Sequence, residues 1–459
     1  MLRLHLGRTP KRRASCERDG ATTETGAVRS DRNCEPANLN PGSLPPRSRT
    51  SSVELFYSQL NFCLFRQTPP RPFQAPIPTS MRTPTPSRRL LPALSLAVSL
   101  LAFAAPEKPG AEVLIGADVS ALATIEAHGG HFSDGGKRED ALTIFRQNGF
   151  SCFRLRLFVS PDGVGIVTND LPYTLALAKR VKASGAGLLL DLHYSDTWAD
   201  PQKQFKPAAW EKLPFEQLVA AVERHTQEVL RSLAAQGTAP DYVQIGNEIT
   251  NGLLWPDGKV EFEKTDDEES WRRFTRLLQA GVDGVRAVFP DKNRPQILLH
   301  IESSGNAPRS LWFFRGIERH RVPYDAIGLS YYPDWHGKIA DFRATLATLA
   351  TTFHKPILVV ETAYPSRGDK YWNGKPNLDW PISPEGQRAF LSDVLAAVRD
   401  TPEGLGAGLF YWFPEAIPVE GLHAWVGGSC ALFDVNGNAL PALSFAAPRL
   451  SSQTPPRHP

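Results

Sequence analysis

The chain has 459 residues and a formal net charge of +3, and 22% of its residues are charged. A chain of this length can bury a large core, either in two or three domains or in one domain of barrel size. The near balance of acidic and basic residues gives no electrostatic basis for binding nucleic acid, so we exclude that class of partner.

The N-terminal part of the sequence has the composition of a leader followed by an export signal. Residues 1–80 are rich in Arg, Pro, Ser and Thr without regularly spaced apolar residues, which predicts a disordered leader. Residues 81–104 have the layout of a secretory signal peptide: Met81, three arginines, an apolar run and small residues before a cleavage site after Ala104. Because a signal peptide belongs at a natural N-terminus, we infer that translation starts at Met81 and that residues 1–80 are not translated. The sequence therefore predicts a secreted or periplasmic protein.

A membrane anchor is the alternative interpretation of the same apolar run. The run is shorter than the roughly 20 residues that a membrane-spanning helix needs, and it contains Pro92 and two serines. We therefore expect no stable membrane span. At the other end of the chain, the composition of residues 451–459 predicts a disordered tail.

Cysteine usage does not indicate a disulfide framework. Of the five cysteines, three lie in residues 1–80, which leaves Cys152 and Cys430. A single bridge between these two and a pair of isolated buried thiols both stay open. The sequence has no CxxC or HExxH pattern, which argues against a structural zinc.

From residue 112 onwards, short apolar runs alternate with segments of helical period, which is typical of βα units around a parallel sheet. The predicted strands cover residues 112–120, 151–159, 187–194, 241–248, 296–302, 324–332, 356–362 and 406–413. The predicted helices include residues 172–184, 215–236, 268–288, 339–353 and 384–400.

Eight strands in residues 105–450 predict one (β/α)8 TIM barrel, with long loops at its C-terminal face. The rival fold is a doubly wound open sheet, which requires a glycine-rich phosphate-binding loop after its first strand. Asp118 and Val119 stand there instead.

Polar side chains gather at the carboxyl ends of the predicted strands, where barrel enzymes assemble their sites. Two of them, Glu248 and Glu361, directly follow apolar runs. Glycoside hydrolysis needs such a pair, one carboxylic acid that protonates the leaving oxygen and one carboxylate that attacks or activates water. For either glutamate alone, the alternative is a strand-end residue paired with Arg154 or Arg156. Aromatic residues on the same rim favour sugar binding, because sugar CH faces stack on aromatic rings.

Several long segments resemble the endo-β-1,4-galactanases of glycoside hydrolase family 53. The most specific are HYSDTWADP, which begins at His193, and NEITNGLLWP, which begins at Asn247. The other matching segments are GADVS, RLRLFVSP, GLSYYP, VVETAYP and YWFP. One departure is Phe413, because family members often carry an acidic residue before the equivalent of Pro414.

The resemblance implies a retaining mechanism, with Glu248 as general acid/base and Glu361 as nucleophile. It further implies that Asn247 hydrogen-bonds a sugar hydroxyl, that Arg154 keeps the nucleophile ionised, and that Tyr332 orients it. The implied central sugar subsites are lined by Asp118, Asp191, His193, His300 and Trp412, with Trp198 and Trp335 as stacking platforms further out.

The substrate implied by the resemblance is galactan or type I arabinogalactan, a pectin side chain, cleaved by a monomer that requires no cofactor. Some bacterial members carry a structural calcium in the long loops near strands seven and eight. That region offers oxygen ligands here, but they do not match a known site one by one, and a solvated polar loop is the alternative. The residues concerned are Asp369, Asn373, Asn377 and Asp379.

Three other functions remain as alternatives. The same pair of glutamates would serve a barrel endoglycanase that acts on mannan, xylan or cellulose. A glycan-binding protein without catalysis is the second. A metallohydrolase is the third, suggested by the Asp191–His193 segment, although barrel metallohydrolases usually take two histidines from the first strand and none is present there.

Overall fold

The computed structural model describes residues 112–446, apart from residues 263, 265–266 and 291–293. The chain divides into two compact units, and all described residues lie in the second unit, Leu100–Pro459. The predicted leader, signal peptide and tail lie outside the described residues.

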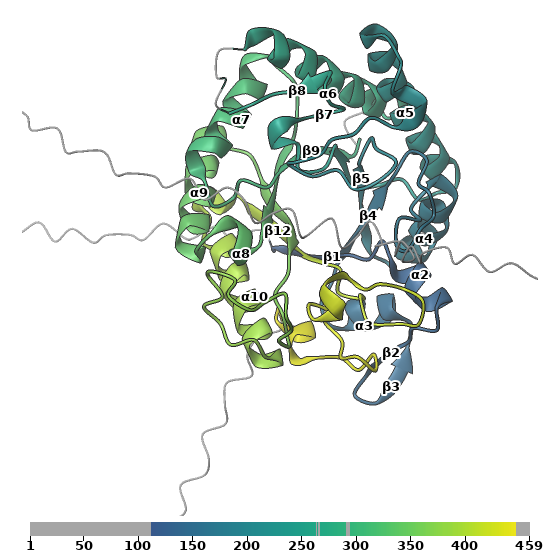
Figure 1. The fold of residues 1–459 in the computed structure, drawn as a ribbon, viewed down its shortest axis with the longest axis vertical. Helices are drawn as coiled ribbons and strands as arrows, with labels where there is room; N and C mark the ends of the chain where they lie inside the picture. Colours follow the sequence, from purple (N-terminus) through teal and green to yellow (C-terminus); the bar gives the residue numbers. More distant parts are fainter. Residues whose placement is uncertain (1–111, 263, 265–266, 291–293, 447–459) are drawn as a thin grey trace, which may run out of the picture. The chain divides into compact units, whose positions relative to one another are not determined.

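Among the described residues, eight parallel strands close into a barrel (Figure 1) in the order β1-β12-β11-β10-β9-β6-β5-β4. This confirms the predicted (β/α)8 fold, because each barrel strand falls within one predicted strand. The strands are β1 (Leu114–Asp118), β4 (Cys152–Leu157), β5 (Gly187–Leu192), β6 (Tyr242–Ile245), β9 (Gln296–Ile301), β10 (Ala326–Tyr331), β11 (Ile357–Thr362) and β12 (Gly406–Trp412).

Helices surround the barrel on its outer side (Figure 1), and the five predicted ones end within one residue of the expected positions. They are α4 (Leu171–Ala183), α5 (Phe215–Ala235), α6 (Glu268–Val288), α9 (Ile339–Phe353) and α10 (Pro384–Arg399). Capping residues that can be read in the sequence fix where a helix begins, as the start of α10 shows. There, Ser383 Oγ accepts from the Gly386 N–H at 3.1 Å, and Pro384 occupies the first helical position. Within the described part of the chain, the structure adds four α-helices to those named above, α2 (Leu122–Ala127), α3 (Ala141–Gln147), α7 (Ala307–Arg319) and α8 (Pro333–His336).

In residues 112–446, as far as the structure describes them, two small antiparallel hairpins lie outside the barrel: β2 (Phe132–Asp134) with β3 (Lys137–Glu139), and β7 (Gly252–Leu253) with β8 (Gly258–Lys259). The second hairpin follows β6 after one turn of 3-10 helix, Ile249–Asn251. That turn is the place where the chain leaves the barrel next to Glu248.

The barrel interior is apolar at its amino end and polar towards its carboxyl end. A small apolar cluster, separate from the main core, includes Cys152, Leu189, Leu298 and Phe410. The Phe410 ring lies where a side chain on Gly116 would be, since a Cβ there would lie 2.3 Å from the ring. Two residues further along three of these strands stand the polar residues Arg154, Asp191 and His300, and on β12 stands Trp412, so the apolar cluster supports a mainly polar layer above it.

A β-bulge on β11 changes which side chains enter the barrel. Leu329 pairs with Val359, but the next residue of β10, Ser330, pairs with Glu361, so Val360 is the extra residue. Leu358 and Val360 both belong to the interior cluster, and strict alternation would place Glu361 on the outer face. The bulge turns Glu361 into the barrel instead.

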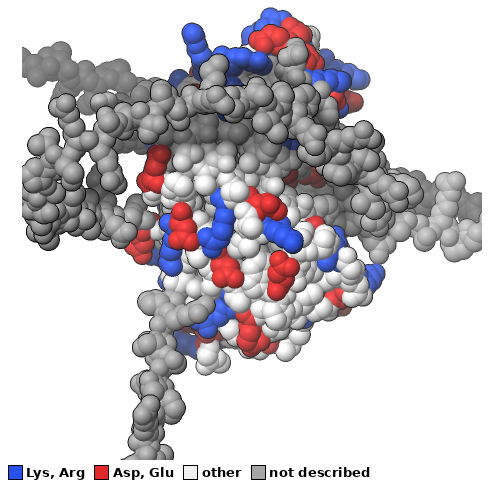
Figure 2. All heavy atoms as spheres, turned by 90° about the vertical axis from the view of Figure 1, so that its left-hand side faces the viewer, with Lys and Arg blue, Asp and Glu red and all other residues white. Residues whose placement is uncertain are grey.

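Cys152 and Cys430 are both buried and free, so the interpretation as two isolated thiols is confirmed and the disulfide is excluded. Among the described residues, none of the helices is long and apolar enough to cross a membrane. Figure 2 shows acidic and basic side chains interspersed over the visible face, in keeping with the small net charge.

Candidate active site

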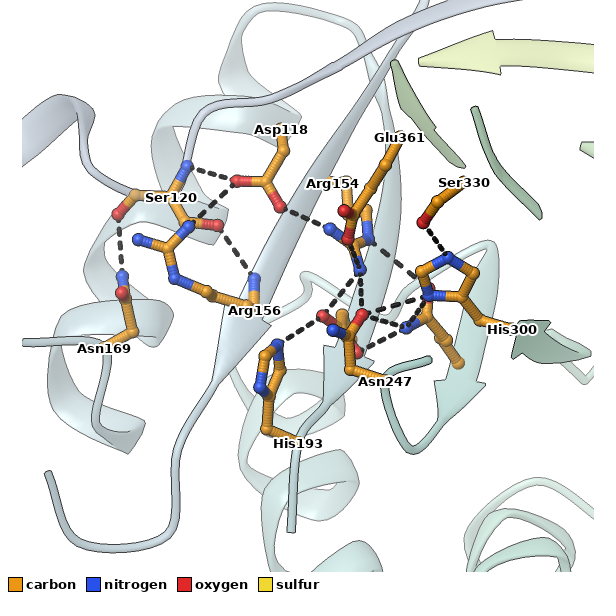
Figure 3. Close-up of polar contacts among 12 residues, drawn as sticks. Asp118, Ser120, Arg154, Arg156, Asn169, His193, Asn247, His300, Ser330 and Glu361 are labelled. Atoms are coloured by element: carbon orange, nitrogen blue, oxygen red, sulfur yellow. Dashed lines mark hydrogen bonds and ion pairs between the residues drawn. The ribbon is translucent and has the colours of Figure 1, made fainter. Parts of the chain in front are cut away.

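Arg154 on β4 is the centre of a buried polar network at the carboxyl end of the barrel (Figure 3). Its guanidinium donates to Asp118 Oδ2 at 2.9 Å, Asp191 Oδ2 at 2.8 Å and Asn247 Oδ1 at 2.8 Å. Its Nη2 also lies 2.9 Å from Glu361 Oε1. Burial alone would lower the pKa of Arg154, but the surrounding carboxylates outweigh it and raise that pKa. Arg154 therefore keeps its positive charge in the barrel mouth, where it is shared among the surrounding carboxyl groups.

Glu361 is 5% exposed and is held by two partners. Tyr332 Oη donates to its Oε2 at 3.1 Å, and its Oε1 makes a close ion pair with Arg154 that is not aligned as a hydrogen bond. Burial raises the pKa of Glu361 to about 7, while Arg154 and the Tyr332 hydroxyl lower it. The two partners favour the ionised carboxylate against the cost of burial.

Glu248 lies three residues beyond the end of β6, at a backbone φ of 48° in the left-handed region. This conformation costs a non-glycine residue about 1–2 kcal/mol, and such strain concentrates at functional sites. Ser330 Oγ donates to Glu248 Oε1 at 2.7 Å. Burial raises the pKa of Glu248 well above its usual value, and the charge of Glu361 raises it further.

The two glutamates meet at Ser330 on β10. Ser330 is the strand partner of Glu361 and the hydrogen-bond donor to Glu248. Neighbouring strands are about 4.8 Å apart, and the charge of Glu361 acts on Glu248, so the two carboxylates lie close together in the barrel mouth. Their environments differ, because Arg154 pairs with Glu361 and no cation pairs with Glu248 among the described contacts. Of the two neighbouring carboxyl groups, Glu248 is therefore the one that holds a proton, and Glu361 is the one that is ionised.

His193 and His300 complete the network from β5 and β9. His193 Nδ1 accepts from the Ala199 N–H at 3.3 Å, so its proton lies on Nε2, which is 2.9 Å from Asp191 Oδ2. His300 Nε2 lies 2.8 Å from Ser330 Oγ. Burial and then the charge of Arg154 lower the pKa of His300 well below its usual value, so this imidazole is neutral.

Asp118, Asp191 and His300 have no exposed surface, so in this structure they orient other site residues rather than form the surface that a sugar would touch.

Gln244 on β6 belongs to the network although sequence reasoning did not single it out. Its Nε2 donates to Asp191 Oδ1 at 2.6 Å and to Asn247 Oδ1 at 3.2 Å, and its Oε1 accepts from Arg154 Nε at 3.3 Å. The sequence did contain one indication of its role, because Gln244 lies between the apolar residues Val243 and Ile245 of the strand.

Aromatic rings form one wall beside the network. The rings of Trp198 and Trp412 pack edge to face, with their planes at 69° and their centroids 6.0 Å apart. The Arg156 guanidinium lies 4.4 Å from the centre of the Trp198 ring and 5.4 Å from that of the Trp412 ring. Trp335 lies apart from this pair, 43% exposed, with Lys375 Nζ 4.8 Å from its ring. The Trp198–Trp412 pair thus lies beside the Arg154 network, whereas Trp335 lies at the periphery of the site.

Glu415 is a second residue that sequence reasoning missed. It follows Pro414, is fully buried, and accepts from the Ala121 N–H at 3.0 Å through Oε1. Burial, followed by the charge of Asp118, raises the pKa of Glu415 to about 8. The sequence signal was present in the run Phe413-Pro414-Glu415, where an acidic residue stands after the proline instead of before it.

Two of the residues considered for calcium are hydrogen-bonded to other residues of the protein. Asp369 Oδ1 accepts from the Tyr371 N–H at 2.7 Å, and Asn377 Nδ2 donates to the Pro333 carbonyl at 3.2 Å. Within the part of the chain that the structure describes, no group of three or more His, Cys, Asp or Glu side chains is placed to hold a metal ion.

Comparison with known proteins identifies the family. Residues 114–446 match the sequence model described as Glycosyl hydrolase family 53. An uncharacterised protein of Niallia circulans, from the region 5′ of bgaB, is 42% identical over 74% of this chain and 95% of its own length. An endo-beta-1,4-galactanase of Bacillus subtilis is 33% identical over 72% of this chain and 84% of its own length. The Ignisphaera aggregans GH53 catalytic domain superimposes with a TM-score of 0.67 at 36% identity, over 74% of this chain and 96% of that domain. The chain therefore belongs to glycosyl hydrolase family 53.

Proposed function

We propose that the protein is an endo-β-1,4-galactanase that cleaves galactan and type I arabinogalactan with retention, using Glu248 as acid/base and Glu361 as nucleophile. The observation that carries this proposal is the difference between the two buried carboxylates. Glu361 is paired with Arg154 and Tyr332, which favours a charged nucleophile, whereas Glu248 has a neutral hydrogen-bond donor and a strongly raised pKa, which favours an acid.

The proposed reaction has two steps at the same carbon. In the first, a Glu361 oxygen forms a bond to the anomeric carbon while the glycosidic C–O bond breaks and the Glu248 proton moves to the leaving oxygen. In the second, Glu248 takes a proton from water, whose oxygen displaces Glu361 and releases the sugar. A retaining pair requires carboxyl groups roughly 5 Å apart, and the meeting of both glutamates at Ser330 supports that spacing. Neither step requires a metal or a cofactor.

The galactan specificity rests on the family and on the names of relatives such as the Bacillus subtilis enzyme. The Trp198–Trp412 wall supports a polysaccharide substrate, because its apolar ring faces suit the CH faces of sugars. We also propose that the protein acts as a monomer.

The direct test measures release of reducing ends from linear galactan, mannan, xylan and cellulose, with product sizes followed over time. We expect cleavage of galactan into a range of oligosaccharides from the start, and NMR of the first products should show the β-anomer. Activity on mannan or xylan without activity on galactan would refute the substrate. Binding of galactan without cleavage would support a binding protein instead.

Two isosteric variants test the roles of the carboxylates. Glu248→Gln should lower kcat/KM on galactan by about 10²–10⁴-fold, yet it should retain more activity on an aryl galactoside whose good leaving group needs no proton. Glu361→Gln should abolish cleavage of both substrates. The matched control is Glu228→Gln on the exposed face of α5, which should leave both rates unchanged. Equal losses on both substrates for Glu248→Gln would contradict its role as the acid.

We propose further that the protein is exported through the segment that starts at Met81, as its charged start, apolar run and small residues suggest. N-terminal sequencing of the natural secreted protein should find a start near Ala105. A peptide from residues 1–80 in the native precursor would contradict translation from Met81.

A further inference from the structure

Ser330 lies between a histidine and a glutamate in a chain of short hydrogen bonds. Its Oγ is 2.8 Å from His300 Nε2 (Figure 3) and 2.7 Å from Glu248 Oε1, and both Ser330 and His300 are fully buried. A serine hydroxyl has one proton to donate. The direction of this chain therefore depends on which nitrogen of His300 carries the proton.

The groups around the other ring nitrogen decide that question. The Glu248 backbone N–H, which can only donate, points at His300 Nδ1 at 3.4 Å. Gln244 Nε2 lies 3.1 Å from the same nitrogen, but its two protons already have oxygen acceptors, among them Asp191 Oδ1 and the Gly246 carbonyl, so it does not count as a donor to His300. Nδ1 therefore faces one backbone donor, the Glu248 N–H, and accepts from it.

One contact, between His300 Nδ1 and the side chain of Asn247, would by itself favour a proton on Nδ1. Asn247 Oδ1 lies 3.0 Å from His300 Nδ1 and is itself an acceptor. This oxygen already accepts from Arg154 Nη2 at 2.8 Å and from Gln244 Nε2 at 3.2 Å, so it has no need of a proton from His300. The proton of the neutral imidazole is therefore on Nε2, where it is donated to Ser330 Oγ.

We propose that Ser330 is a positioning residue for Glu248, and that His300 compels the Ser330 hydroxyl to donate to Glu248 Oε1. With one oxygen of Glu248 occupied in this way, the other oxygen, Oε2, is left to give its proton to the leaving group and to take a proton from water. The inference rests on the acid/base role proposed above for Glu248 and deepens it.

The same hydrogen bond serves both halves of the reaction. When Glu248 has lost its proton, a negative charge remains in a buried site, and the Ser330 hydroxyl is the donor in contact with it. The geometry does not change between the two steps, because the hydroxyl donates to Oε1 whether or not Oε2 carries a proton. Ser330 therefore stabilises the ionised form of Glu248 without blocking its reprotonation.

Ser330→Ala is the direct test, and its expected effect is about a tenfold fall in kcat/KM on galactan, with a much smaller fall on an aryl galactoside that has a good leaving group. The basic limb of the pH profile should move to higher pH, because the hydrogen bond from Ser330 lowers the pKa of Glu248. Ser330→Cys, which keeps a weaker donor of similar size, should fall between the wild type and Ser330→Ala. Ser310→Ala is the matched control, since it removes another fully buried serine hydroxyl, bonded to the Ser303 carbonyl at 2.7 Å, and it should leave the rates and the pH profile unchanged.

The double variant separates a positioning role from a purely structural one. Ser330→Ala should have no further effect in the Glu248→Gln background, because it acts through the acid/base group. A fall of the same size in both backgrounds would overturn the inference, as would a Ser330→Ala enzyme with an unchanged pH profile. Full activity of Glu248→Gln on galactan would instead overturn the proposed function, so the two failures are distinguishable.

Discussion

Replacing Glu361 with glutamine should make the protein more stable at alkaline pH while it removes activity. The wild-type carboxyl is buried, and burial raises its pKa from 4.5 to about 7 despite the opposing charge of Arg154. A carboxyl with a raised pKa binds its proton more tightly in the folded chain than in the unfolded chain. Its contribution to stability is therefore complete below pH 4.5 and is lost as the pH rises through about 7.

The size of this change in the free energy of unfolding follows from the shift in the pKa of Glu361. The difference between 4.5 and about 7 corresponds to about 3 kcal/mol, since one pKa unit is about 1.4 kcal/mol. The side chain is only 6% exposed, so solvent screening reduces this figure little. Glutamine is nearly isosteric with the protonated acid and does not titrate. The stability of Glu361→Gln relative to the wild type should thus increase by up to about 3 kcal/mol between pH 4 and pH 8.

Urea denaturation at several pH values measures this difference directly. Comparison with the wild type is essential because Glu415, with its pKa raised to about 8, gives a similar slope in both proteins. The exposed control Glu228→Gln should show no such change between pH 4 and pH 8. A constant difference between Glu361→Gln and the wild type at every pH would refute the electrostatic account of this site.

Four further outcomes are expected. Arg154→Met should lower the free energy of unfolding at pH 7 by about 3–5 kcal/mol in urea denaturation, because the buried Asp118 and Asp191 lose their shared cation; a change below 1 kcal/mol would contradict this. Trp198→Ala should raise the KM for galactan more than it lowers kcat, since it removes one ring of the aromatic wall, and a change in kcat alone would argue against a binding role. Excess chelator should leave the rate on galactan unchanged, whereas a large loss would show that a metal is needed. Cys152 and Cys430, each 1% exposed, should resist alkylation in the native protein and react after unfolding, as mass spectrometry of the labelled peptides can show.

Much of the fold follows from local patterns along the chain. The barrel strands are short apolar runs, and helices such as α6 begin and end where caps and periodicity place them. The carboxyl ends of parallel strands meet at one end of a barrel, so the gathering of Asp118, Arg154 and Asp191 at one mouth could also be expected from sequence alone. The specific roles of Glu248 and Glu361 came from the resemblance to a family, since a pair of glutamates by itself fits several glycanases.

Other features depend on contacts between distant residues. Alternation along β11 would direct Glu361 outwards, and only the bulge at Val360, formed where β10 and β11 pair, turns it towards Arg154. Gln244 likewise gains its importance from partners on other strands, because a single polar residue in a strand does not reveal what it will meet. The sequence by itself determined which elements form and which end of the barrel is polar, since hydrophobic period and capping act within a few residues. Only the tertiary structure decided strand register, side-chain direction and the different environments of the two carboxylates, because these depend on groups brought together by closure of the barrel.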